Sequence, residues 1–72
     1  KHRQAIELYE KAQGIFAANG RMKDFLRTKN NLGVVLVEQN RFREAEKVFW
    51  DMLKTAEKQK DNQFVTMANL NL

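Results

Sequence analysis

The sequence lacks the residues on which several classes of protein depend. Its 72 residues include no Cys and one His, which excludes a disulfide framework and a Cys-ligated zinc or iron–sulfur site. We therefore expect no metal site and a reducing, cytoplasmic setting. No apolar run approaches the length of a membrane span or a signal sequence, so we expect no membrane contact. No nucleotide-binding loop or nucleophile motif is present, and we expect neither an enzyme nor a cofactor.

The chain also has only a small excess of positive over negative charge, with a formal net charge of +4. Lys and Arg alternate with Glu and Asp, which is typical of solvated helix faces that carry i,i+4 ion pairs. The densest group of cations consists of Arg21, Lys23, Arg27 and Lys29. No DNA- or RNA-binding motif accompanies this group. Nucleic-acid binding by this segment is therefore a third interpretation, after a protein-binding scaffold and a structural array.

Apolar residues recur at helical spacing along the sequence and predict an all-α chain. We expect helices over residues 2–18, from about 25 to 39, over 42–58 and from about 63 onward. The residues expected to face the core are Ala5, Leu8, Tyr9, Ala12, Ile15 and Phe16; Phe25, Leu26, Leu32, Val35 and Leu36; Phe42, Ala45, Val48, Phe49, Met52 and Leu53; and Phe64, Met67, Ala68 and Leu70.

Polar segments separate these helices. Asn19-Gly20 ends the first helix, and Asn40 marks the turn after the second, because Gly and Asn accept the left-handed conformation found past a helix end. Asp24 is expected to cap the second helix, and Asp61 or Asn62 the fourth. Connections this short make neighbouring helices antiparallel.

The central hairpin contains two small residues, Gly33 and Ala45, on its apolar stripes. A Gly inside a helix costs about 1 kcal/mol relative to Ala, so it usually has a packing reason. We expect Gly33 to lie against the helix that carries Ala45, with the two backbones in close approach.

The pattern repeats within the chain. Residues 5–12 are echoed by residues 45–52, and residues 29–32 are echoed, at a slightly smaller offset, by residues 67–70. The second echo aligns Asn31 with Asn69. Repetition of this kind is typical of stacked helical hairpins, in which neighbours share one continuous core.

The chain resembles the tetratricopeptide repeat family in Leu32-Gly33, Leu36, Ala45 and Phe49, which match the family's spacing. It departs from the family pattern at Lys29, where Trp is common, at Met52, which replaces an Ala, and in having no closing Pro. Both offsets exceed the family's usual ~34 residues, so the resemblance is to long repeats such as those of kinesin light chains and bacterial peptide-sensing regulators.

This resemblance implies a right-handed solenoid of stacked antiparallel hairpins, as a fragment of a longer protein. Residues 1–20 would be the second helix of one repeat, residues 25–61 a complete repeat and residues 63–72 the start of the next. The resemblance also implies a concave groove, lined by the first helix of each repeat. The residues expected in this groove are Arg27, Asn30, Asn31, Val34, Glu38 and Asn69.

An Asn side chain offers both a donor and an acceptor, so it can bind a peptide backbone amide on both sides. The resemblance therefore implies a scaffold that binds a protein or peptide within a larger regulatory or adaptor protein. The competing interpretation is a purely structural or oligomerising array, in which these Asn residues are only solvated. Self-association through exposed repeat ends is a further expectation, with Leu8, Phe16, Phe64 and Met67 as the apolar contacts.

Overall fold

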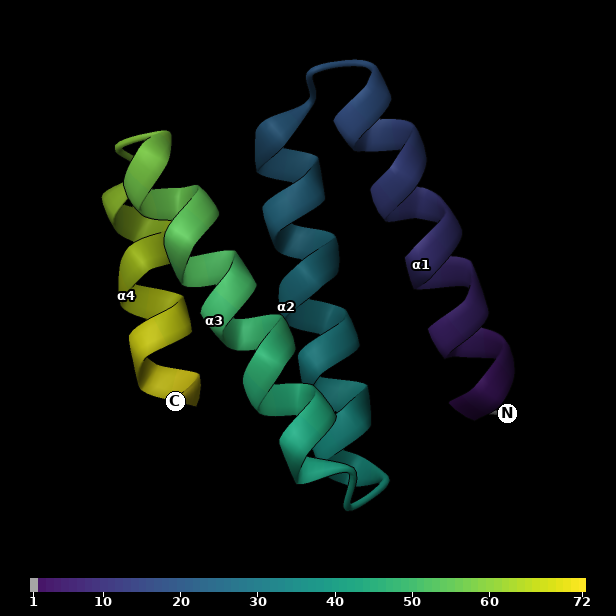
Figure 1. Cartoon of the computed structure of the whole chain (residues 1–72). Helices are drawn as coiled ribbons and strands as arrows, with labels where there is room; N and C mark the ends of the chain where they lie inside the picture. Colours follow the sequence, from purple (N-terminus) through teal and green to yellow (C-terminus); the bar gives the residue numbers. More distant parts are fainter. Residues whose placement is uncertain (1) are drawn as a thin grey trace.

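The structure is a computed structural model, and it describes residues 2–72. Successive helices run in opposite directions and pack side by side (Figure 1). The described residues form helices only, which confirms the all-α prediction. The helices are α1 (His2–Ala18), α2 (Met22–Glu38), α3 (Phe42–Lys58) and α4 (Asn62–Asn71).

The helices follow one another at a constant interval. They begin at His2, Met22, Phe42 and Asn62, so their starts are evenly spaced along the chain. The step from Met22 to Asn62 is therefore one complete hairpin repeat. In this register Asn31 corresponds to Asn71, and the sequence-based alignment of Asn31 with Asn69 is wrong by two positions. Residues 29–32 and 67–70 share only Asn-Leu, which is too short a match to define the register between two helices.

A left-handed residue follows each of the first three helices. Gly20, Asn40 and Lys60 have φ values of 68°, 59° and 57°. The N–H of the next residue donates to a carbonyl five positions back, which is the Schellman ending and satisfies carbonyls that the helix leaves unpaired. The predicted stops at Gly20 and Asn40 are confirmed, whereas Lys60 was not foreseen. These bonds run from Arg21 to Phe16, from Arg41 to Leu36 and from Asp61 to Ala56, at 2.9, 2.8 and 2.9 Å.

Of the two predicted N-terminal caps, the one on α4 is confirmed and the one on α2 is wrong. The Asp61 side chain accepts a hydrogen bond from the backbone N–H of Phe64 at 3.3 Å, so Asp61 caps α4. Asp24 does not cap α2, because α2 begins at Met22 and its cap residue is Arg21. The Schellman turn returns the chain to helical geometry immediately, so Asp24 lies inside the first turn of the helix.

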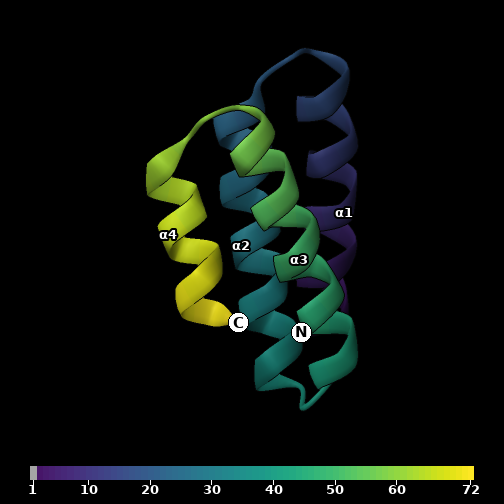
Figure 2. The ribbon, with the colours of Figure 1, turned by 60° about the vertical axis from the view of Figure 1, so that its left-hand side comes forward.

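All four helices contribute residues to the core. Figure 2 shows α4 beside α2 and α3, the two helices that it contacts. Leu26 and Met52 are completely buried, and truncating either to Ala removes contacts worth about 2–5 kcal/mol. The core residues are Ile6, Leu26, Leu32, Leu36, Ala45, Phe49, Met52, Leu53, Ala56, Phe64 and Ala68.

Some residues expected in the core are exposed instead. Leu8 and Ile15 are 65% and 60% exposed, because α1 packs against α2 alone among the described helices. Phe42, the first residue of α3, is 60% exposed. The reason is that α4 has 10 residues against 17 in α3, so α4 ends before it reaches Phe42. Leu70 is 81% exposed on the outer side of α4. Ile6, Ala56 and Thr28 are buried but were not predicted to be.

The contact at Gly33 was predicted with the wrong partner residue. Gly33 does face α3, as expected, but the atoms closest to a Cβ built on it all belong to the ring of Phe49. Ala45 is buried nearby on α3 without making that contact. A flat ring, rather than two nested backbones, therefore fills the space that Gly33 leaves.

Candidate protein-binding face of α2

The side of α2 opposite its packing surface brings several predicted groove residues together. On a helix that turns by about 100° per residue, the predicted groove residues of α2 fall on one face. Leu32 and Leu36 point the other way, into the core. The structure thus groups five of the six predicted site residues on one helix face. Four of them are exposed, namely Arg27, Asn31, Val34 and Glu38, and Asn30 is half-buried beside them.

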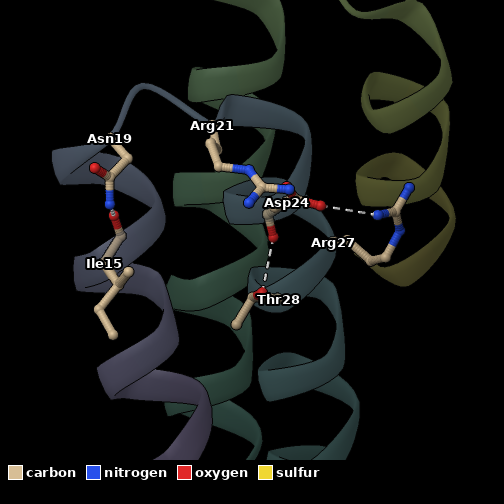
Figure 3. Close-up of polar contacts among 6 residues, drawn as sticks. All are labelled: Ile15, Asn19, Arg21, Asp24, Arg27 and Thr28. Atoms are coloured by element: carbon tan, nitrogen blue, oxygen red, sulfur yellow. Dashed lines mark hydrogen bonds and ion pairs between the residues drawn. The ribbon is translucent and has the colours of Figure 1, made fainter.

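Asp24 organises the first turns of this face. Its carboxylate lies 2.7 Å from the guanidinium of Arg21 and 3.2 Å from that of Arg27, and the two groups approach it from opposite sides (Figure 3). The Thr28 hydroxyl donates to the Asp24 carbonyl at 2.7 Å, which satisfies a hydroxyl on a buried residue. Both Arg side chains remain more than half exposed, and each has further N–H donors for an outside anion.

Lys29 does not join the other cations of the predicted basic group. Its ammonium lies 3.0 Å from Asp51 of α3 and 5.7 Å from the centre of the Phe25 ring. The Lys29 side chain is only 12% exposed. Lys29 therefore links α2 to α3, and the basic group is reduced to Arg21, Lys23 and Arg27.

An amide pair joins α2 to α4. The Asn71 Nδ2 donates to the Asn30 Oδ1 at 2.7 Å, at the surface of the molecule. This bond uses one of the two polar atoms of each amide. The Asn30 Nδ2 can still donate a hydrogen bond and the Asn71 Oδ1 can still accept one, and these are the two groups that pair with the C=O and the N–H of a peptide backbone. Asn30 was predicted from the sequence as a groove residue, whereas Asn71 was not. The regular spacing of the helix starts identifies Asn71 as the equivalent of Asn31.

Asn69 lies apart from this face. Two residues along a helix correspond to a rotation of about 200°, so Asn69 and Asn71 point to nearly opposite sides of α4. Because Asn71 reaches α2, Asn69 points away from α2, where it is exposed. The structure thus separates Asn69 from the five residues on α2.

A groove of about 270 Å³ opens where α2 ends, α3 begins and α4 ends. Its apolar walls include Phe42 and Val37, which are both exposed, and Asn71 connects it to the amide pair. No sequence pattern indicated this groove, because Phe42 was assigned to the core. The lining residues are Val37, Phe42, Arg43, Ala45, Glu46, Phe49, Asn71 and Leu72.

Residues 2–72 bring together no group of three or more His, Cys, Asp or Glu side chains that could hold a metal ion. None of the helices described for these residues is both long and apolar enough to cross a membrane.

Comparison with known proteins supports the assignment of the central hairpin. The family model for the tetratricopeptide repeat matches residues 25–58, which cover most of α2 and all of α3. The curated proteins and the solved structures compared with the chain include no match. Repeats of this family typically act as protein-interaction scaffolds and are not themselves catalytic. The helical hairpin formed by α2 and α3 is therefore a tetratricopeptide repeat.

Proposed function

We propose that the exposed face of α2, extended by Asn71 of α4, binds an extended peptide segment of a partner protein. The observation that carries this proposal is the amide pair of Asn30 and Asn71. It leaves one amide donor, on Asn30, and one amide acceptor, on Asn71, where α2 and α4 meet. A peptide backbone that crosses α2 and α4 can pair with both atoms at once.

The neighbouring side chains favour a peptide of particular chemistry. Arg27 and Arg21 share one carboxylate, so this end of the face carries a surplus positive charge. Val34 and Val37, which are 39% and 41% exposed, offer apolar contacts farther along the helix. The preferred segment therefore has an acidic residue or a terminal carboxylate near Arg27 and an apolar residue near Val34.

The experiment is a selection from a displayed library of random peptides, followed by mapping of the bound peptide with backbone amide chemical shifts. We expect enrichment of acidic sequences, with shift changes concentrated at Arg27, Asn31, Val34 and the side-chain amides of Asn30 and Asn71. Shift changes confined to α1 or to the outer side of α3 would contradict the proposal.

A purely structural array is the competing function, and the exposed apolar residues at the two edges of the array favour it. In that case no peptide family would be enriched, and the α2 face would show no shift changes with any selected sequence. We further propose that the chain acts within a larger regulatory or adaptor protein, where the bound peptide is the signal.

A further inference from the structure

The side of α3 that faces away from the core carries a row of cations around the only tryptophan of the chain. These residues follow one another at steps of three or four positions, so they form one line along the helix, about 22 Å long. All of them are exposed, and Trp50 is 50% exposed. We call this line the α3 ridge, and its members are Arg43, Lys47, Trp50, Lys54 and Lys58.

The position of the α3 ridge stays exposed when further hairpins stack on the array. Helix α1 is the equivalent of α3 one repeat earlier, and the hairpin of α2 and α3 follows it. Among the described helices, α1 and α3 do not contact each other, so a following hairpin does not cover this line. The equivalent positions of α1, counted from the helix starts, are all exposed although that hairpin is present. They are Arg3, Glu7, Glu10, Gly14 and Ala18.

The chemistry of the line differs between the two helices. In α1 it has one cation, two carboxylates and no aromatic side chain, whereas in α3 it has four cations and a Trp. The α1 line serves the same place in the stacked array without a Trp or a surplus of positive charge. Hairpin stacking therefore does not account for the composition of the α3 ridge.

The carboxylates nearest to the middle of the ridge are engaged elsewhere. Glu44 lies three positions before Lys47 and Asp51 four positions after it, so helix spacing would let either pair with this ammonium. However, Glu44 pairs with Arg41, and Asp51 lies 3.0 Å from Lys29 of α2. Within residues 2–72 no ridge cation forms an ion pair. The ridge thus keeps its N–H donors for an outside anion.

Carboxylates on both sides of the ridge restrict the kind of anion that fits. Glu46 lies on the side facing α4, where it lines the groove beside Asn71, and Asp51 lies on the side facing α2. A broad polyanion, such as a nucleic-acid duplex or an anionic membrane, would press its own charges against these carboxylates. A single strand of nucleic acid binds by stacking on successive aromatic side chains, and the ridge has one. A narrow acidic protein segment avoids both problems.

We propose that the α3 ridge binds an acidic helix of a partner protein. Steps of three and four residues are the spacing along which a second helix packs, so acidic side chains at matching steps meet the four cations. An apolar side chain of the partner covers Trp50, and Trp is the residue type most enriched among the dominant contacts of protein interfaces. The ridge lies on the second helix of the repeat, so this inference does not depend on peptide binding by α2.

The fluorescence of Trp50 tests this directly, because the chain has no other Trp and the indole emission moves to shorter wavelength when the ring leaves water. The probe is an Ala-rich helical peptide of about 20 residues without aromatic residues. It carries Glu at the steps of the four cations and Leu at the step of Trp50. We expect a saturable shift to shorter wavelength that weakens with added salt. A peptide of the same composition with the Glu residues spread around the helix should bind at least tenfold more weakly.

Three results would overturn the proposal. The first is an unchanged emission up to about 1 mM peptide. The second is equal binding of the two peptides, because the spacing of the ridge would then not matter. The third is a tighter response to a single-stranded oligonucleotide or to phosphatidylserine vesicles than to the matched peptide, because the partner would then not be a protein.

Paired variants locate the contact. Lys47→Glu with Lys54→Glu should weaken binding of the matched peptide at least tenfold, whereas Arg3→Glu with Lys11→Glu makes the same change in net charge on α1 and should leave binding unchanged. All four side chains are exposed, and circular dichroism verifies that the helices are kept.

Trp50→Ala, measured by calorimetry because it removes the fluorophore, should also weaken binding at least tenfold. Equal binding by the ridge variants and the parent would overturn the proposal. So would a peptide that leaves Trp50 emission unchanged and loses its binding in Arg27→Ala, because it would then lie on the α2 face.

Discussion

The ring of Phe49 lies directly over Gly33 and occupies the space that any side chain at residue 33 would need. A Cβ at this position would lie 3.0 Å from Cδ1 of the ring and closer still to Cε1 and Cζ. Phe49 is only 2% exposed, so the ring is held by the surrounding core and has little room to move. This contact fixes how closely α2 and α3 approach each other, and so it sets the position of the α2 face relative to the next hairpin.

Gly33→Ala should destabilise the chain despite the better helix propensity of Ala. The propensity gain is about 1 kcal/mol, whereas the methyl group must displace a packed ring at a cost of about 1–3 kcal/mol. We expect a lower free energy of unfolding in urea, and a still larger loss for Gly33→Leu. An unchanged denaturation midpoint for both variants would contradict the packing described.

Gly14 provides the matched control, since a Cβ built there meets no atom within 4 Å. Gly14→Ala should therefore raise stability by about 0.5–1 kcal/mol, through helix propensity alone. A second control is Phe49→Leu, which makes room beside Gly33. In that background Gly33→Ala should cost less than it does in the parent, and a double-mutant cycle measures the difference.

Lys60→Gly should stabilise the chain. Lys60 has a φ of 57°, a left-handed conformation that costs a residue with a Cβ about 1 kcal/mol and costs Gly nothing. The melting temperature should rise by a few degrees. Gly20→Ala makes the reverse change at the equivalent turn and should lower it. The same sign for both substitutions would contradict the account of the turns.

Asp61→Ala should loosen α4 more than it loosens the other helices. The Asp61 carboxylate is the side-chain cap of this helix, and losing such a cap costs about 0.5–2 kcal/mol. The rate of amide hydrogen exchange should rise more in residues 62–71 than in α2. Asn62→Ala, at the next position, removes no cap and should change exchange little. Equal acceleration throughout the chain would show that α4 does not open independently.

The sequence predicts the helices and most turns because these depend on local signals. Apolar periodicity defined α1 and α3, and the left-handed preference of Gly and Asn located the ends at Gly20 and Asn40. Lys60 escaped prediction because a Lys gives no such signal, and the Schellman hydrogen bonds enforce its conformation.

The other differences between prediction and structure concern which side of each helix is covered by a neighbouring helix. Leu8 and Phe42 have core-like spacing, but a helix position is buried only where a neighbouring helix is present along its full length. The pairing of Asn30 with Asn71 depends on the relative placement of two helices that are separated by a complete helix, α3. Local sequence does not encode that placement, so α2's share of the candidate site was predictable and α4's was not.

The most direct test of the proposed binding face compares two Asn residues on α4. Titrations with one selected acidic peptide should use the parent chain, Asn71→Ala and Asn69→Ala. Asn71→Ala removes one peptide acceptor, worth about 0.5–1.5 kcal/mol of binding free energy, so we expect a binding constant weakened several-fold to about tenfold. Asn69→Ala lies on the other side of α4 and should bind the peptide like the parent. Equal affinities for all three chains, or a loss for Asn69→Ala alone, would contradict the assignment of the amide pair as the peptide site.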